Sequence, residues 1–344
     1  MTYSKKRIAE ILNVDPSLIT YYEQGKRTPT VGKLNQLAEI FSIPMEWLIT
    51  ENIGNIQVVA RSHGKETPAE LKEILFFQQM VADFIELLKK TGMPDYKYKG
   101  PQYPNKSPVP SIIRDIKTLL RLEEVVCYER LKDSLQSEFS VYIFEIPFQN
   151  ERISGITFFR DQVFSVFINK GHTKQRRLFS IAHELGHILF HVHQESYLIS
   201  RLTSTDPLEK EANQFAQMFL ILETQLKKLI SSKKLHLFRR EYIQRLADFF
   251  NVSPESIFYT LAKKGSVQYK WKSYRPDTDY PKGYDKSWSY KDLPWFYVLT
   301  CYLAVRQDLI STSRFSEMLY TDIRTASEIF KNIEKIFNQD DIES

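Results

Sequence analysis

Apolar residues recur at helical spacing in two short segments near the start of the chain. The first segment has Ile8, Ile11 and Leu12 at this spacing and can end at Asn13. The second begins at Asp15 and Pro16, because aspartate can cap a helix and proline is tolerated in its first turn. It can end at Gly25, since glycine favours the left-handed backbone that terminates helices. Two short helices joined by a tight turn predict a helix-turn-helix.

The pattern changes twice between residues 68 and 110. Residues 68–92 have apolar positions at helical spacing and end in a basic turn and a glycine, which predicts one long helix. Its apolar face would lie in a core or in a homodimer interface. Residues 93–110 are rich in proline, lysine and tyrosine, which predicts a proline-broken linker. Such a mixture of basic and aromatic residues could also stack on nucleic-acid bases, but we prefer the linker.

A cluster of strand-like runs follows a helix predicted at 112–126. The runs cover 140–148, 153–159 and 163–170, are rich in valine, isoleucine and aromatic residues, and are separated by polar turns. A long helix is then predicted at about 174–192. Helices around one small sheet indicate a helix-rich α+β fold.

The C-terminal part is predicted to be helical at 293–307 and 324–337. Residues 266–292, which precede these helices, are crowded with tyrosine, tryptophan and lysine. This stretch could dock a protein or a nucleic acid, or wrap on the preceding domain, which we prefer. The expected organisation is a small all-α head at 1–55, a helix and linker at 56–107, an α+β domain at 108–266, and a C-terminal extension of unknown role at 267–344.

Composition narrows the class of protein. The 344 residues are 42% hydrophobic and 26% charged, which is ordinary for a globular chain. Two cysteines are too few for a disulfide scaffold. The N-terminus has no apolar core of a signal peptide, and no run of eighteen apolar residues predicts a membrane helix. We therefore expect a cytoplasmic protein with no membrane partner.

Residues 179–191 read FSIAHELGHILFH and contain a His-Glu-x-x-His motif. His183 and His187 are four positions apart, so a helix places both rings on one face, where they can bind one metal ion. Glu184 would lie beside that ion and could accept a proton from a water molecule bound there. The motif is typical of zinc peptidases. The alternative is a buried helix whose histidines are satisfied within the core.

We expect one zinc ion per chain. Such a site needs a third protein ligand besides the two histidines. His191 continues the spacing, but three histidines along one helix span about 12 Å, so we expect it beside the site or in packing. A helix predicted at 204–221 offers Glu209 and Glu211, and its small residues would let it pack closely on the motif helix. We prefer Glu209 and keep Glu211 as the alternative. Asn213, one turn further on, could support a ligand from behind.

The predicted helix-turn-helix suggests contacts with DNA. Its second helix would enter the major groove and present Ser17, Thr20 and Tyr21 to base edges. Lys26 and Arg27 follow at the helix end, where they could contact phosphates. Residues 1–50 contain six basic and five acidic side chains, a balance that supports DNA binding only weakly. The alternative is a small helical module that binds protein.

Two known families resemble these segments. DPSLITYYEQGKRTP resembles the recognition-helix region of the XRE (Cro/C1-type) helix-turn-helix family, and the resemblance covers about residues 5–50. RRLFSIAHELGHILFH, followed by EKEANQFAQMFL, resembles the ImmA/IrrE family of metallopeptidase domains over about residues 108–266. Residues 242–265 look like the C-terminal helix-turn-helix-like segment of that family, which implies two short helices there. That resemblance implies a zincin-like fold, His183 and His187 as zinc ligands, Glu184 as the base, and a third ligand from the segment 209–211. It also implies cleavage of a transcriptional repressor.

These observations lead to two hypotheses. The leading one is a zinc-dependent endopeptidase joined to a DNA-binding head, which cleaves a transcriptional repressor or a similar regulatory protein. The alternative is an XRE-type transcription regulator or antitoxin-like module that does not cleave, and whose zinc domain senses or scaffolds. Loss of cleavage in a Glu184→Gln variant would separate them.

Overall fold

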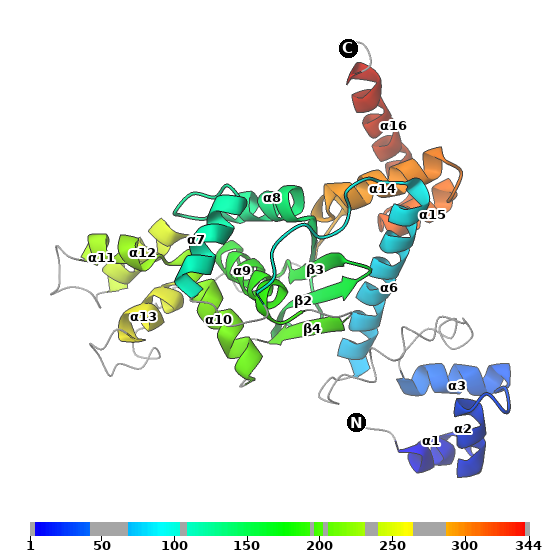
Figure 1. Ribbon diagram of the computed structural model, residues 1–344. Helices are drawn as coiled ribbons and strands as arrows, with labels where there is room; N and C mark the ends of the chain where they lie inside the picture. Colours follow the sequence, from blue (N-terminus) through cyan, green and yellow to red (C-terminus); the bar gives the residue numbers. More distant parts are fainter. Residues whose placement is uncertain are drawn as a thin grey trace. The chain divides into compact units, whose positions relative to one another are not determined.

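The computed structural model describes residues 4–41, 68–103, 109–192, 196–201, 206–230, 240–263 and 287–340 (Figure 1). The chain divides into two compact units, residues 1–80 and 81–344. The helix α6 (Pro68–Thr91) runs across this division. The predicted linker residues 104–108 and most of the aromatic stretch 266–292 lie outside the described residues.

The first unit contains the predicted helix-turn-helix. Its helices are α1 (Lys5–Leu12), α2 (Pro16–Glu23) and α3 (Val31–Phe41). Apolar residues on the facing sides of α1 and α2 form a small core, because only those sides repeat at helical spacing. The buried members of this core are Ile8, Ala9, Leu12 and Ile19.

The ends of α1 and α2 follow the signals in the sequence. Asn13 ends α1 with a left-handed backbone at φ 49°. The carboxylate of Asp15 caps α2 by accepting a hydrogen bond from the backbone N–H of Ser17 at 2.8 Å, and Pro16 occupies the first turn. Gly25 follows α2 with φ 67°, a conformation that favours glycine. The tight turn between the two helices is therefore confirmed.

A four-stranded sheet lies at the centre of the second unit (Figure 1). Its strands are β1 (Val141–Ile146), β2 (Ile153–Arg160), β3 (Val163–Asn169) and β4 (Ser196–Arg201), in the order β1-β3-β2-β4. β1 pairs with β3 in parallel, and the other two pairs are antiparallel. The three predicted strands are confirmed. β4 was not predicted, because its sequence SYLISR has one β-branched and one aromatic residue, whereas each of the other strands has three and two.

One face of the sheet is covered by α8 (Tyr128–Phe139) and α9 (Lys174–Phe190). α9 is the predicted motif helix, and it is buried along most of its length. α8 was not predicted, because its sequence is dominated by charged and polar residues. Alternate residues of the strands face these helices, as the two-residue period of a strand requires. Those in the shared core are Val141, Ile143, Phe164, Val166 and Ile168.

Five further helices extend the core on the α9 side. α10 packs directly on α9, and α7 contacts α10. α12 and α13 pack on one another and form the two-helix segment predicted at 242–265. The bounds are α7 (Val109–Leu119), α10 (Pro207–Leu220), α11 (Glu223–Ile230), α12 (Arg240–Phe250) and α13 (Pro254–Lys263).

The other face of the sheet is aromatic. Tyr142 and Phe144 of β1 point to this side, and the ring of Phe144 stacks on that of Phe167 at 4.7 Å between centroids. Phe84 of α6 contacts both β1 rings, at 5.0 and 6.2 Å. Tyr297 of α14 (Trp295–Arg306) contacts Phe84 at 5.1 Å and Phe144 at 5.4 Å. The C-terminal part of the chain therefore covers this face together with α6.

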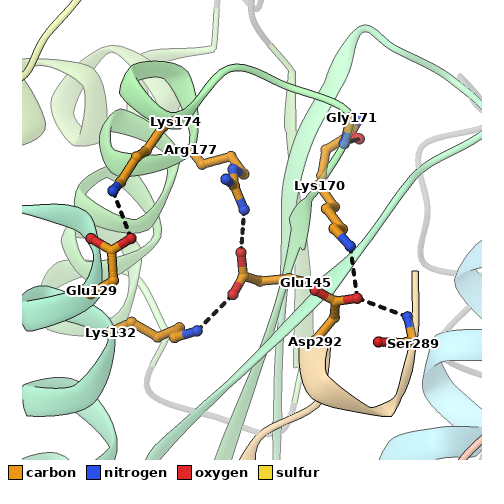
Figure 2. A network of polar contacts seen from close by, with 10 residues as sticks. Glu129, Lys132, Glu145, Lys170, Gly171, Lys174, Arg177, Ser289 and Asp292 are labelled. Atoms are coloured by element: carbon orange, nitrogen blue, oxygen red, sulfur yellow. Dashed lines mark hydrogen bonds and ion pairs between the residues drawn. The ribbon is translucent and has the colours of Figure 1, made fainter. Parts of the chain in front are cut away.

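The remaining C-terminal elements follow the same arrangement. They are the 3₁₀ turn η3 (Tyr290–Asp292) and the helices α15 (Thr312–Met318) and α16 (Ile323–Asp340). Lys170, at the end of β3, donates from Nζ to Oδ2 of Asp292 at 2.7 Å (Figure 2). This half-buried ion pair joins the C-terminal part to the sheet. We preferred the expectation that the aromatic stretch 266–292 wraps on the preceding domain. Its described end, residues 287–292, contacts that domain through the Lys170–Asp292 ion pair, as this expectation requires.

The described part of the predicted linker is fixed in place. The Tyr98 N–H donates to the carbonyl of Gln162 at 2.8 Å, and the Tyr103 N–H donates to that of Leu189 at 2.7 Å. The ring of Tyr98 also lies edge-on to Phe164 at 4.8 Å. Residues 98–103 are thus part of the second unit, because their tyrosines complete its core. The four segments expected from the sequence, with boundaries near 55, 107 and 266, remain a prediction.

Among the residues that the structure describes, no helix is long and apolar enough to cross a membrane.

Candidate metal centre

The motif helix α9 lies between the sheet and α10. Thr173 caps its start by accepting a hydrogen bond from the Arg176 N–H at 3.4 Å. The side chains of its motif are deeply buried, with His183, Glu184 and His187 only 4%, 1% and 0% exposed. Buried polar groups of this kind need partners inside the protein or a bound ion.

α10 approaches α9 very closely where the two helices cross. At Gly186, a Cβ atom would lie 3.1 Å from the Phe215 ring and 3.3 Å from Cα of Ala212. Small residues on both helices therefore allow the close packing. The sequence analysis identified the alanine of α10 but missed Gly186, which lies inside the motif itself. The close crossing lets Glu209, in the first turn of α10, reach the histidines of α9.

Three donor groups converge at this crossing. The Nε2 atoms of His183 and His187 are 3.0 Å apart. Oε1 of Glu209 is 3.0 Å from Nε2 of His187, and Oε2 is 3.5 Å from Nε2 of His183. A tetrahedral zinc ion with bonds of about 2.1 Å separates its ligand atoms by about 3.4 Å. The side chains therefore fit such an ion.

The electrostatics of the cluster also suit a cation. Burial disfavours a charge on Glu209, but the hydrogen bonds from His183 and His187 outweigh it and lower its pKa to about 2. Burial likewise opposes protonation of His183, yet Glu209 and the charge of Glu184 raise its pKa above the ordinary value. The cluster therefore attracts positive charge, and a metal ion bound there would take the place of the imidazole proton.

Each imidazole is also contacted from behind. Nδ1 of His183 lies 3.0 Å from Oδ1 of Asn213, as the sequence analysis proposed for this asparagine. Nδ1 of His187 lies 2.8 Å from Nδ1 of His191. Nε2 of His191 in turn lies 3.3 Å from Oε2 of Glu211. The two candidate carboxylates thus occupy different places, with Glu209 in the cluster and Glu211 behind His191.

Glu184 points away from α10 and into the sheet. Its Oε2 accepts a hydrogen bond from Oγ1 of Thr157 on β2, at 2.6 Å. Its Oε1 faces Gly155, where a Cβ atom would lie only 2.4 Å away. Oε1 has no hydrogen-bond partner among the described residues. The sequence analysis missed Gly155 and Thr157, although small residues at alternate positions of an apolar strand were a signal for a close approach.

Comparisons with known families agree with this geometry. The family model described as the IrrE N-terminal-like domain, a peptidase family, matches residues 136–262. A helix-turn-helix family model matches residues 1–48. The chain carries an IrrE-like domain and a helix-turn-helix domain. The search of curated proteins gave no match for the chain.

The other described histidines near the motif of the IrrE-like domain, His172 and His191, do not join the cluster. His191, the residue that caps the C-terminal end of α9, lies beside His187 rather than with the three converging groups. Nε2 of His172 lies 2.8 Å from the carbonyl of Glu151, in a separate buried contact. Among the described residues, the one group of three side chains placed to share an ion is His183, His187 and Glu209.

The helix-turn-helix domain presents its expected DNA contacts on and after α2. Ser17 and Tyr21 are exposed one turn apart, and Thr20 is half-buried beside them. Lys26 and Arg27 are exposed, and their backbone N–H groups donate to the carbonyl of Tyr21 at 2.9 and 3.3 Å. The turn therefore holds both basic residues next to the exposed side of α2.

Proposed function

We propose that the IrrE-like domain is a zinc-dependent endopeptidase. The observation that best supports this is the buried convergence of His183, His187 and Glu209, with Glu184 on the same helix. A bound zinc ion would polarise a peptide carbonyl and lower the pKa of a water molecule towards about 7. One ion per chain would be held by the two imidazoles and the Glu209 carboxylate.

Glu184 would act as the general base. The hydrogen bond from Thr157 to Oε2 fixes the orientation of the carboxylate. Oε1 keeps its hydrogen-bonding capacity, so it can accept a proton from the attacking water. Gly155 leaves the space in which that carboxylate lies.

The helix-turn-helix domain suggests where the substrate is found. Its presence in the same chain would bring the peptidase to DNA in the cytoplasm, where regulatory proteins are concentrated. We therefore propose a protein substrate that itself binds DNA, such as a transcriptional repressor. A homodimer remains a further prediction, but the apolar face of α6 lies in the core of its own chain, where Phe84 contacts Tyr142 and Tyr297.

The proposal is tested with the Glu184→Gln variant. This change keeps the shape of the side chain and removes the base, so zinc content should stay at about one per chain while cleavage is lost. New protein N-termini would be mapped in cells that express the wild type or the variant, and each candidate cleavage repeated with purified proteins. A cut that the variant makes as fast as the wild type would refute the role of Glu184. Wild-type protein without zinc after reconstitution would refute the metal site.

A second function is supported by the helix-turn-helix domain alone. The chain could regulate transcription by binding an operator, with the zinc domain as a sensor or scaffold. Selection of bound sequences from random DNA would test this. Arg27→Ala should weaken binding to all sequences, because phosphate contacts carry no sequence information. Glu184→Gln should leave DNA binding unchanged. Failure to select any sequence at low salt would count against this function.

A further inference from the structure

We infer that His191 is a positioning residue, held by Glu211, that keeps His187 in the one tautomer able to bind a metal ion through Nε2. This inference rests on the proposed metal site and deepens it. It concerns two residues outside the converging cluster, one of which the sequence suggested as a metal ligand.

The starting point is the orientation of the His187 ring. Its Nε2 atom faces both His183, at 3.0 Å, and Oε1 of Glu209, at 3.0 Å. Its Nδ1 atom faces the opposite way, towards Nδ1 of His191 at 2.8 Å. A nitrogen atom that binds a metal ion cannot carry a proton, so a metal-binding His187 must carry its proton on Nδ1.

A proton on Nδ1 of His187 also determines where the proton of His191 lies. Nδ1–H of His187 donates to Nδ1 of His191, which must therefore be unprotonated. His191 then carries its proton on Nε2 and donates it to Oε2 of Glu211 at 3.3 Å. The carboxylate can only accept, so the contacts run in one direction from the metal site to Glu211.

The two histidine ligands are thus supported in different ways. Behind His183 stands the amide oxygen of Asn213, an atom that can only accept a hydrogen bond. Behind His187 stands a second imidazole, which could present either an acceptor or a donor. Glu211 removes this ambiguity, because it favours the tautomer in which Nε2 of His191 is the donor.

Burial makes the contact strong and local. The His191 side chain is only 4% exposed, whereas that of Glu211 is 38% exposed. The backbone N–H of His191 donates to the carbonyl of His187 at 2.9 Å, which fixes its position at the end of α9. Water therefore cannot readily replace the imidazole as the acceptor for His187, whereas it can partly replace Glu211.

The test measures zinc affinity of the full-length chain by competition with a coloured chelator. His191→Ala should weaken zinc binding by about 10–100-fold, the usual effect of losing a partner behind a metal-binding imidazole. His191→Asn should recover most of this loss, since an asparagine amide oxygen can occupy the place of Nδ1. Glu211→Gln should weaken binding by a few-fold, and Glu223→Gln, an exposed carboxylate on α11, should have no effect.

Two further measurements separate positioning from a structural role. Glu211→Gln should have no additional effect in the His191→Ala background, because Glu211 acts through His191. The melting temperature of the zinc-free protein should hardly change in Glu211→Gln, because that side chain is partly exposed. In His191→Ala the zinc-free protein should lose some stability, because a buried ring is removed, and the rise in melting temperature on adding zinc should shrink as well.

The outcomes are distinct from those for the proposed function. Zinc affinity within about twofold of the wild type in both His191→Ala and Glu211→Gln would overturn the inference and leave the metal site intact. An equal loss from Glu211→Gln with and without His191 would overturn the link between the two residues. A wild-type chain that binds no zinc would overturn both proposals. If His191→Ala fails to fold, the zinc affinities of His191→Asn and Glu211→Gln still test the inference.

Discussion

The two faces of the central sheet are built from different kinds of residue. On the side of α9, the small or polar residues Gly155, Thr157 and Glu145 lie among the apolar ones. Gly155 leaves space for the Glu184 carboxylate, Thr157 donates a hydrogen bond to it, and Glu145 pairs with Lys132. On the side of α6 and α14, rings of phenylalanine and tyrosine pack on one another. The comparison suggests that the α9 face holds the reactive groups, whereas the aromatic face mainly stabilises the fold.

This difference has a physical basis. Burying polar groups costs free energy unless each is paired, so a face that holds a reactive site gains less from burial than an apolar one. Aromatic rings bury large apolar areas and gain further from edge-on and stacked contacts. The aromatic face, covered by α6 and α14, should therefore contribute more to the stability of the domain than the α9 face, although the His-Glu-x-x-His motif lies on the α9 face.

The largest effect is expected from deleting the C-terminal part after residue 266. This change would remove Tyr297 and uncover Phe84, Tyr142 and Phe144. Each ring is worth about 1.5–3 kcal/mol of burial, and together they approach the whole stability of a domain, about 5–15 kcal/mol. The truncated chain should fail to give a cooperative thermal transition by circular dichroism.

A deletion from the other end is the control for that experiment. A chain that starts at Pro68 lacks the helix-turn-helix but keeps α6, and it should melt cooperatively. If the chain ending at residue 266 melts as the full-length protein does, the aromatic face is not needed and the comparison fails.

The next effect concerns the buried ion cluster on the α9 side. Glu145 of β1 lies between Lys132 of α8, at 2.7 Å, and Arg177 of α9 (Figure 2). Its carboxylate is 6% exposed, so Glu145→Gln leaves two mostly buried cations without their partner. Removing one member of such a cluster typically costs about 3–5 kcal/mol. Because the side chains of Lys132 and Arg177 are still 31% and 20% exposed, the cost should lie at or below the lower end of this range.

A matched pair lies close by in the same view. Glu129 contacts Nζ of Lys174 at 2.7 Å, but both side chains are more than half exposed (Figure 2). Glu129→Gln should therefore cost about 0–1 kcal/mol in urea unfolding. Equal losses for the two variants would show that burial does not set the strength of these contacts.

The local elements of the site could be predicted from the sequence. His183 and His187 fall on one helical face by spacing alone, and the Asp206-Pro207 start places Glu209 in the first turn of α10. The three strands with strong β composition were likewise found, because their signal lies within each segment.

What the sequence did not reveal depends on which elements pack opposite one another. Gly155 and Thr157 matter because Glu184 lies above them, and Gly186 because α10 crosses there. Similarly, Tyr98 belongs to the core only because β3 presents Phe164 to it. Such relations join residues far apart in the chain, and no periodicity within one segment encodes them.

The smallest expected effect tests how tightly the reactive face is fitted. In Gly155→Ala, the new Cβ would lie 2.4 Å from Oε1 and 3.0 Å from Cδ of Glu184, so the whole carboxylate must shift. The shift would break the hydrogen bond from Thr157 and cost about 1–3 kcal/mol in urea unfolding. Zinc content should not change, because Gly155 does not contact the three converging groups, but cleavage should be lost.

The same substitution in a Glu184→Ala background is the decisive control. With the carboxylate gone, alanine at position 155 meets no close atom of that side chain, and replacing a strand glycine should be neutral or stabilising by about 0.5–1 kcal/mol. The sign of the effect should therefore reverse between the two backgrounds. If Gly155→Ala still lowers the free energy of unfolding without Glu184, the strand itself requires glycine at this position. The close approach of Glu184 to β2 would then not be the reason for Gly155.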